Sequence, residues 1–159
     1  MTDTPDTTPG REMPPSQWET LVAAHAQRQA ELFELNKVVL FDALAAAGIT
    51  EIVVTFDGFG DSGQVEDTEV KNGDNYVDLP ATTIEIAEAI WGEPEPRRSS
   101  IDIAAAVENL VYDVLGMTHA GWQDGAGAYG EVTFEVAVRT ITLDHNTRYT
   151  AIESYLHTF

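Results

Sequence analysis

The residue types best suited to chemistry gather in a glycine-rich segment, Gly58–Gly63, with the sequence GFGDSG. This segment matches the dinucleotide-binding pattern G-x-G-x-x-G, which requires a helix directly after it to present backbone amides to a pyrophosphate. Residues 64–69 are acidic and β-like instead. Extension to Val65 matches the glycine-rich loop of protein kinases, but the strand lysine and DFG motif of a kinase do not follow. We therefore expect no nucleotide site in this segment.

Ser62 lies in the letters GDSG, which also surround the nucleophile of trypsin-like proteases. In those enzymes another glycine follows, whereas this chain has Gln64. A Ser62 nucleophile would also need a histidine as its general base, and His119, His145 and His157 are the downstream choices. The sequence favours a protein without catalytic residues.

Three acids flank or interrupt the glycine-rich segment: Asp57, Asp61 and Glu66. Carboxylate oxygens are the ligands that hard divalent cations prefer, but the spacing does not fit the EF-hand loop. Acids in such a turn more commonly bond to its own backbone. We expect no cofactor, and a divalent cation held by these three acids is the alternative.

Two other segments concentrate glycine, histidine and aromatic residues. The first, HAGWQDGAGAYG, contains His119 and Trp122. It is either a wide turn with the indole folded onto the core or the lip of a ligand site. The second, HNTRY, contains His145 and Arg148. Because the chain has 8 basic residues against 27 acids, we expect Arg148 to form an ion pair with one of the three acids named above, and an anion-binding role is the alternative.

Each of these three segments leaves or enters a predicted strand, so we expect them to meet at one end of the sheet. Such a meeting would give the isolated arginine its acidic neighbour. The candidate functional cluster consists of Asp57, Asp61, Ser62, Glu66, His119, Trp122, His145 and Arg148.

The strings FDGFGDSGQVE, HAGWQDGAGAYG and HNTRY together resemble a family of small acidic bacterial and phage proteins that share a domain of unknown function. The resemblance covers about residues 35–159. In the family, an acid and an amide usually follow the tryptophan of the second string, whereas Gln123 and Asp124 follow it here. The resemblance implies one architecture for the three segments and a gene in mobile or phage-derived surroundings. It implies no activity.

The elements that must position these residues begin with a predicted helix over residues 16–47, which Gly48 should end. Ser16 and Glu19 form a capping box at its start. Residues 32–44 are apolar on most sides, so the second half of this helix should be buried. The length of the helix predicts either a break near Asn36 or a first half that projects from the body.

The strands are predicted from β-branched and alternating segments. Residues 82–91 fit a strand or a helix, with the helix preferred, and residues 93–98 read as an irregular linker. A second helix should begin near Ser99 and Asp102 and end at Gly116. The predicted strands are 50–56 and 64–70 as a hairpin, 75–79, 132–136, 140–143 and, after a turn at His145 and Asn146, 148–157. This order predicts an α+β fold with a mostly antiparallel sheet of about five strands and two main helices packed on one face.

Composition limits the class of protein further. The 159 residues include no cysteine and carry a formal net charge of −19, with twelve acids between Glu51 and Glu95. Such a field repels nucleic-acid phosphates. No apolar run is long enough for a membrane span and the acidic N-terminus lacks a signal-peptide core, so we expect a cytoplasmic protein. Residues 1–15 should be a disordered tail before a single α+β domain at 16–159.

These observations predict a non-enzymatic interaction protein whose acidic surface binds a basic protein, such as one that handles nucleic acid. Solubility alone is the simpler explanation of the charge. The alternatives are a metal-dependent hydrolase using Asp57, Asp61, Glu66 and His145, and a sensor of cations or small molecules. We expect no direct binding to nucleic acid or membrane, and the sequence leaves the oligomeric state open.

Overall fold

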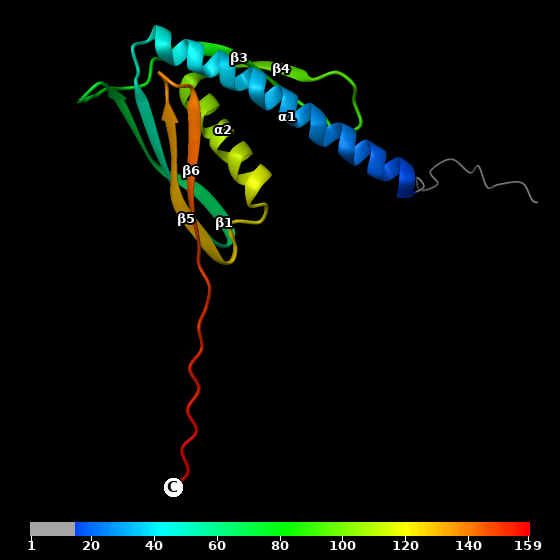
Figure 1. Ribbon diagram of the computed structural model, residues 1–159, viewed down its shortest axis with the longest axis vertical. Helices are drawn as coiled ribbons and strands as arrows, with labels where there is room; N and C mark the ends of the chain where they lie inside the picture. The colour runs from blue at the N-terminus through cyan, green and yellow to red at the C-terminus, as the bar shows by residue number, and fades with distance from the viewer. Residues whose placement is uncertain (1–14) are drawn as a thin grey trace, which may run out of the picture.

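The computed structural model describes residues 15–159, except for the side chains of Pro15 and of residues 59–62. Within these residues the chain forms two helices and six strands (Figure 1). The helices are α1 (Pro15–Ala46) and α2 (Ile103–Thr118). The strands are β1 (Glu51–Asn72), β2 (Asn75–Tyr76), β3 (Thr83–Glu88), β4 (Arg97–Asp102), β5 (Asp124–Glu135) and β6 (Thr140–Thr147).

A four-stranded antiparallel sheet, in the order β2-β1-β5-β6, forms one layer of the fold. Strand β1 is long because it doubles back on itself. The Thr50 N–H donates to the Lys71 carbonyl at 2.8 Å, and a Cβ placed on Gly58 would lie 3.0 Å from the Cα of Gly63. This doubled strand accounts for the hairpin predicted here. Strands β3 and β4 form a separate antiparallel pair.

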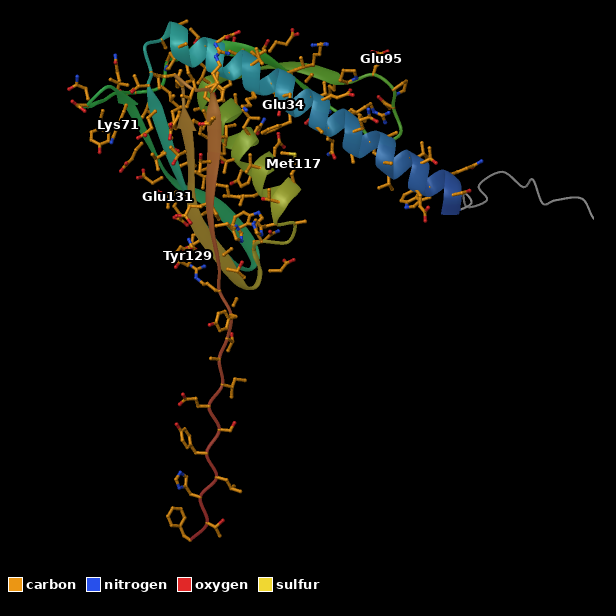
Figure 2. All side chains as sticks on the ribbon, viewed as in Figure 1. Glu34, Lys71, Glu95, Met117, Tyr129 and Glu131 are labelled. Atoms are coloured by element: carbon orange, nitrogen blue, oxygen red, sulfur yellow. The ribbon has the colours of Figure 1, made fainter. Side chains whose placement is uncertain are left out.

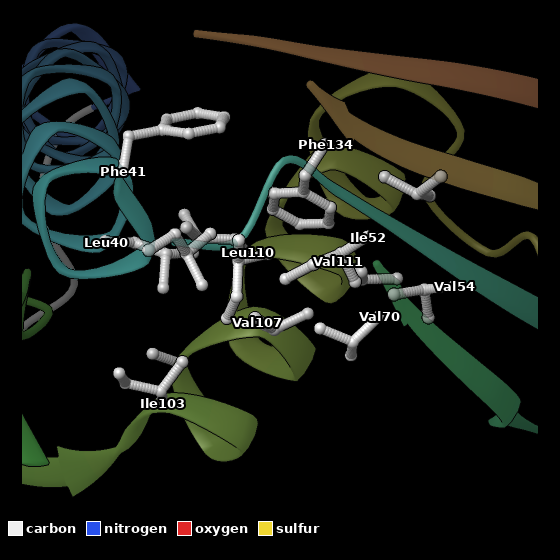
Figure 3. Close-up of a cluster of buried hydrophobic side chains, with 14 of the residues drawn as sticks. Leu40, Phe41, Ile52, Val54, Val70, Ile103, Val107, Leu110, Val111 and Phe134 are labelled. Carbon is white, nitrogen blue, oxygen red and sulfur yellow. The ribbon is translucent and has the colours of Figure 1, made fainter. Parts of the chain in front are cut away.

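The inner face of the sheet meets both helices in one hydrophobic core (Figure 3). Alternate residues of β1 point inward and lie opposite apolar residues of β5, as Ile52 does opposite Phe134. The helices contribute Leu40, Phe41 and Leu44 from α1 and Val107, Leu110, Val111 and Leu115 from α2. The predicted fold class is therefore confirmed: α+β, with a mostly antiparallel sheet and two helices packed on one face.

Helix α1 runs unbroken for 32 residues, and its first half projects beyond the four-stranded sheet and α2, with the β3–β4 connection beside it (Figure 1). This projection confirms one of the two predicted outcomes, and no break occurs at Asn36. The predicted capping box is wrong, because the helix already begins at Pro15. Proline suits a first helical turn since it has no N–H to leave unpaired. Ser16 therefore lies inside the first turn, where its carbonyl accepts a hydrogen bond from the Thr20 hydroxyl at 2.9 Å.

Residues 82–91 contain strand β3 instead of the predicted helix. The reason is tertiary, because the Asn36 side chain completes the backbone hydrogen bonding of this strand from α1. Its amide donates to the Ala87 carbonyl at 2.8 Å and its oxygen accepts from the Ala87 N–H at 3.0 Å. Strand β4 begins at Arg97, within the segment 93–98 that was predicted to be irregular.

Helix α2 confirms the second predicted helix. The carboxylate of Asp102 accepts a hydrogen bond from the Ala105 N–H at 2.7 Å and acts as the N-cap. The helix continues beyond Gly116 and ends at Thr118. The sequence therefore located this element well, with a small error at each end.

Strands β5 and β6 extend well beyond the predicted segments. Strand β5 begins at Asp124, inside the glycine-rich stretch, and β6 runs through His145 and Asn146, so the predicted turn at these two residues is wrong. The last strand was predicted at residues 148–157, but residues 148–159 contain no helix or strand and extend away from the sheet (Figure 1). An isolated extended segment lacks the neighbouring strand that would satisfy its backbone.

Among residues 15–159, no helix is both long and apolar enough to cross a membrane. The predicted disordered tail, residues 1–15, lies outside the described residues, apart from Pro15 at the start of α1.

Candidate functional site

An ion pair between Arg148 and Asp57 ties the end of β6 to β1. Two guanidinium nitrogens donate to the two carboxylate oxygens at 2.8 and 3.1 Å, which is a bidentate arrangement. This hydrogen bonding lowers the pKa of Asp57 and raises the pKa of Arg148, and the attraction between the opposite charges acts in the same directions. The predicted ion pair is confirmed, and Asp57 is the acid that forms it.

Arg148 makes further contacts that fix the start of the C-terminal segment. Its Nη1 lies 3.2 Å from the Gly58 carbonyl oxygen and 3.4 Å from that of Ala128. Its backbone N–H donates to the Gly127 carbonyl at 2.8 Å. The guanidinium carbon lies 4.7 Å from the ring centroid of Tyr129, within range of a cation–π contact. Arg148 therefore clamps the two central strands to the chain that follows β6.

The indole of Trp122 packs on a floor made by two glycines. A Cβ at Gly58 would lie 2.6 Å from the indole and one at Gly63 would lie 2.4 Å from it, so neither position has room for a side chain. The indole also meets Phe56 edge to face, with ring centroids 5.4 Å apart. Of the two predicted interpretations, the structure favours an indole folded onto the core. The glycine pattern that resembles a nucleotide loop makes space for an aromatic ring.

His119 and His145 stack with their ring centroids 3.6 Å apart and an angle of 4° between their planes. Phe56 stacks on His145 at 5.9 Å. Burial of the ring, and secondarily the neighbouring His119, lowers the pKa of His145. Its Nε2 lies 3.2 Å from the Thr147 hydroxyl, while its Nδ1 is buried without a hydrogen-bond partner among the described residues. His145 is therefore harder to protonate than a free imidazole.

The three predicted segments therefore meet at one end of the sheet. The contacts just described form two groups there: Asp57 with Arg148, and His119, Trp122 and His145 around Phe56, with Gly58 touching both groups. Glu66 is exposed and accepts a hydrogen bond from Gln64 at 3.3 Å instead of joining them. The side chains of Asp61 and Ser62 lie outside the described part of the chain.

Metal binding was predicted as an alternative for the acids of this region. Where side chains are described, no group of three or more His, Asp and Glu residues is arranged to hold a metal ion. Both carboxylate oxygens of Asp57 are bonded to Arg148. Asp61, another candidate ligand, is not among the described side chains. The described candidates therefore do not assemble into a cation site.

The outer face of the four-stranded sheet is a surface that sequence reasoning missed. Glu51 lies directly opposite Glu135, and Glu131 lies directly opposite Asp144. We call these four residues the acidic face. Figure 2 shows Glu131 on the side of the sheet away from α2. Alternating glutamate and threonine near Glu131 indicated a strand, but only the register of the strands places the acids opposite one another.

Comparison with known proteins gives a family and no activity. No curated protein and no solved structure matches the chain. The model of a family of unknown function, DUF6878, matches residues 32–159, which contain both the Arg148 clamp and the acidic face. This match confirms the predicted resemblance to a family of that kind. The chain therefore belongs to the family of unknown function DUF6878.

Proposed function

We propose that this protein binds a basic protein partner through the acidic face of its sheet, without catalysis. The supporting observation is the pairing of like charges, Glu131 with Asp144 and Glu51 with Glu135. Lys71 lies 4.0 Å from Glu51 and partly offsets the second pair, so the first pair provides most of the support. Such cross-strand pairs cost the folded protein stability. Solubility alone would be served equally well by acids placed apart. A lysine or arginine docked between the members of each pair removes the repulsion.

The residues around the acidic face are suited to contact with the surface of another protein. The helices lie on the other side of the sheet, so this face is open (Figures 1 and 2). Tyr129 is 46% exposed beside the acids, and aromatic residues of this kind are enriched in protein interfaces. Thr133 and Thr142 lie opposite each other in the row between the charged rows and add hydroxyl groups.

The partner that we propose is a protein whose basic surface handles nucleic acid. A surface that binds phosphates has the density of lysine and arginine needed to match paired acids. The net charge of −19 adds long-range attraction to such a partner. The cysteine-free sequence suits the cytoplasm, where we place this encounter, in the phage or mobile-element setting that the family resemblance implies.

The residues at the end of the sheet support binding in preference to catalysis because their carboxylate and their indole are already engaged by neighbouring residues. Asp57 is bonded to Arg148, and the Trp122 indole is covered by Gly58 and Gly63. A catalytic acid or base needs access to a proton of its substrate. Here both oxygens of the Asp57 carboxylate already accept hydrogen bonds from Arg148.

The test compares two variants that lose the same number of charges. The acidic-face variant is E51Q/E131Q/E135Q/D144N, and the matched control is D74N/D78N/E93Q/E95Q, whose residues are exposed in loops or beside them. The probe is a fluorescent peptide of alternating lysine and serine, measured by anisotropy at physiological salt. We expect the acidic-face variant to bind about tenfold more weakly and the control less than about threefold more weakly.

Equal losses in the two variants would show that the peptide senses only the overall charge, and the proposal would fail. It would also fail if the unmodified protein bound the peptide no better than a peptide of alternating glutamate and serine. A second readout is stability, because the acidic-face variant should unfold at a higher temperature than the control once its like-charge pairs are gone.

A further inference from the structure

Apolar residues form one stripe along α1, which is buried in the second half of the helix and exposed in the first half. Its members recur at the helical repeat: Trp18, Val22, Ala26, Phe33, Leu40 and Leu44. Leu40 and Leu44 are fully buried, whereas Val22 is 44% and Trp18 is 52% exposed. Trp18 meets Trp91 of the β3–β4 connection at 5.2 Å, which covers one side of its ring. The stripe therefore leaves the core and continues along the projecting half of α1.

This stripe opens onto a groove between α1, β3 and α2, with a volume of about 640 Å³. Its apolar wall consists of Leu32 and Phe33 from α1 and Ala106, Leu110 and Met117 from α2. Met117 is 53% exposed and lies on the helix side of the molecule (Figure 2). The flexible thioether of methionine is common on surfaces that accept partner segments. The groove therefore offers a partly apolar surface that residues 15–159 leave accessible.

Two acids give this groove its charge. Glu88 comes from β3 and Asp113 from α2, and no lysine or arginine is among the lining residues. Burial raises the pKa of Asp113, and the nearby negative charge of Glu88 raises it further. Arg97 of β4 forms an ion pair with Glu88 from outside the groove, so Asp113 is the groove acid without an ion-pair partner among the described residues. A cation that entered the groove would relieve the repulsion between the two carboxylates.

We propose that this groove binds a basic amphipathic helix of a partner protein. From Ala106 to Met117, α2 supplies a wall that at 1.5 Å per residue is about 16 Å long, which matches three turns of a docked helix. Apolar side chains of that helix cover the groove wall and the stripe of α1. Basic side chains at its edge reach Glu88 and Asp113, which fixes its orientation.

Charge favours this occupant over the chain's own C-terminal segment, residues 148–159. That segment is apolar and exposed, but its one arginine is already held by Asp57. The groove lies on the helix side of the sheet, opposite the acidic face. The inference therefore goes beyond the function proposed for that face and does not depend on it.

The test uses the full chain and a synthetic helical peptide of about four turns, with leucine on one face and lysine on the other. Methyl NMR reports on the groove directly, because Met117 is one of only 3 methionines in the chain. We expect the peptide to shift the Met117 methyl resonance. The double variant E88Q/D113N should bind about tenfold more weakly, while the control D78N/E93Q should stay within about twofold.

Two matched peptides separate charge from apolar contact. A peptide with glutamate in place of lysine should not bind, and one with serine in place of leucine should leave the Met117 resonance unmoved. The proposal is overturned if that resonance stays fixed at saturating peptide or if the glutamate peptide binds equally well. It is also overturned if deletion of residues 149–159 alone shifts the resonance, because the groove would then hold the C-terminal segment. The acidic-face variant should still give the Met117 shift, so the two proposals can fail separately.

Discussion

Arg148 joins β1, β5 and the C-terminal segment through one guanidinium group. We expect Arg148→Ala to lower the free energy of unfolding more than the loss of an isolated surface ion pair would, because Asp57 loses two charge-assisted hydrogen bonds. Solvent screening at this partly exposed pair keeps the loss small. Arg148→Lys should recover less than half of it, since an ammonium group cannot pair with both oxygens in the same way. Urea unfolding measures both variants.

Arg98 provides the control for this prediction. It lies 3.6 Å from Glu85, and both side chains are 62% exposed, so Arg98→Ala should cost less than about 0.5 kcal/mol. The two arginines should also differ in acid. The pKa of Asp57 is lowered from 3.8, so the stabilisation by Arg148 is fully present above that value and is lost as pH falls through the lower, folded pKa. Equal losses for the two alanine variants would contradict the clamp.

The glycine floor under Trp122 predicts steric intolerance. Gly63→Ala would place a methyl group 2.4 Å from the indole, and we expect it to destabilise the fold by about 1–3 kcal/mol. Gly116→Ala is the control, because nothing lies within 4 Å of its Cβ and alanine favours a helix, so it should stabilise by about 0.5–1 kcal/mol. Thermal unfolding distinguishes them. A neutral Gly63→Ala would mean that the indole does not lie on this floor.

The stacked histidines predict a loss of stability just below neutral pH. The pKa of His145 is lowered from 6.5 in the folded state. At pH values between the folded and unfolded pKa, the unfolded chain binds a proton that the folded chain excludes. Stability should therefore be level above about pH 7.5 and fall as pH decreases through 6.5. His119→Ala should raise the pKa of His145 and flatten this dependence. Urea unfolding across pH and NMR titration of His145 give the measurement, and stability that increases toward acid would refute it.

Among the elements, the β3–β4 pair is attached to α1 through a side chain that acts like a neighbouring strand. Asn36→Asp keeps the acceptor for the Ala87 N–H but replaces the donor to the Ala87 carbonyl with a carboxylate oxygen. We expect this change to cost about 1–3 kcal/mol and to speed hydrogen exchange along β3. Exposed Gln27→Ala, also on α1, should change neither quantity. Unchanged exchange in β3 would show that other contacts hold the pair.

The same attachment explains why one element was predicted correctly and another was not. Residues 32–44 signal burial locally, because their apolar side chains repeat on several faces of one helix. Residues 82–91 carry a strand pattern and a helix pattern together. The Asn36 contact that accompanies the strand comes from 51 positions away in the sequence. Residues 148–157 show the converse, since a β-like composition forms no strand there without a neighbour.

The candidate site, too, was predicted from the sequence only in part. Scarcity of basic residues was enough to predict an ion pair for Arg148, but the choice of Asp57 depends on how β1, β5 and β6 align. The acidic face depends on alignment entirely, because the pairing of Glu131 with Asp144 is a property of register. Composition revealed the charge of the molecule, and the sheet determines where that charge is concentrated.

At the scale of the whole molecule, the two proposed binding surfaces lie on opposite sides of the sheet. The acidic face is flat and charged, whereas the groove combines apolar walls with Glu88 and Asp113. Both attract cations, and the net charge of −19 directs basic molecules to either side. Long-range attraction therefore brings a basic partner to either side of the molecule. The shape of each surface then determines whether that partner binds there.

The C-terminal segment exposes large apolar side chains, each at least 76% exposed: Tyr149, Ile152, Tyr155, Leu156 and Phe159. At neutral pH, mutual repulsion of the acidic bodies keeps these segments apart. Near the isoelectric point of about 4.2 that repulsion disappears, and we expect reversible turbidity that a chain ending at Arg148 does not show. Light scattering across this range tests it, with equal melting temperatures at neutral pH as the control, and equal turbidity of both chains would exclude the segment as the cause. In colloidal terms, net charge keeps the molecules dispersed and the apolar C-terminal segment makes them associate. Removal of that segment separates the two effects.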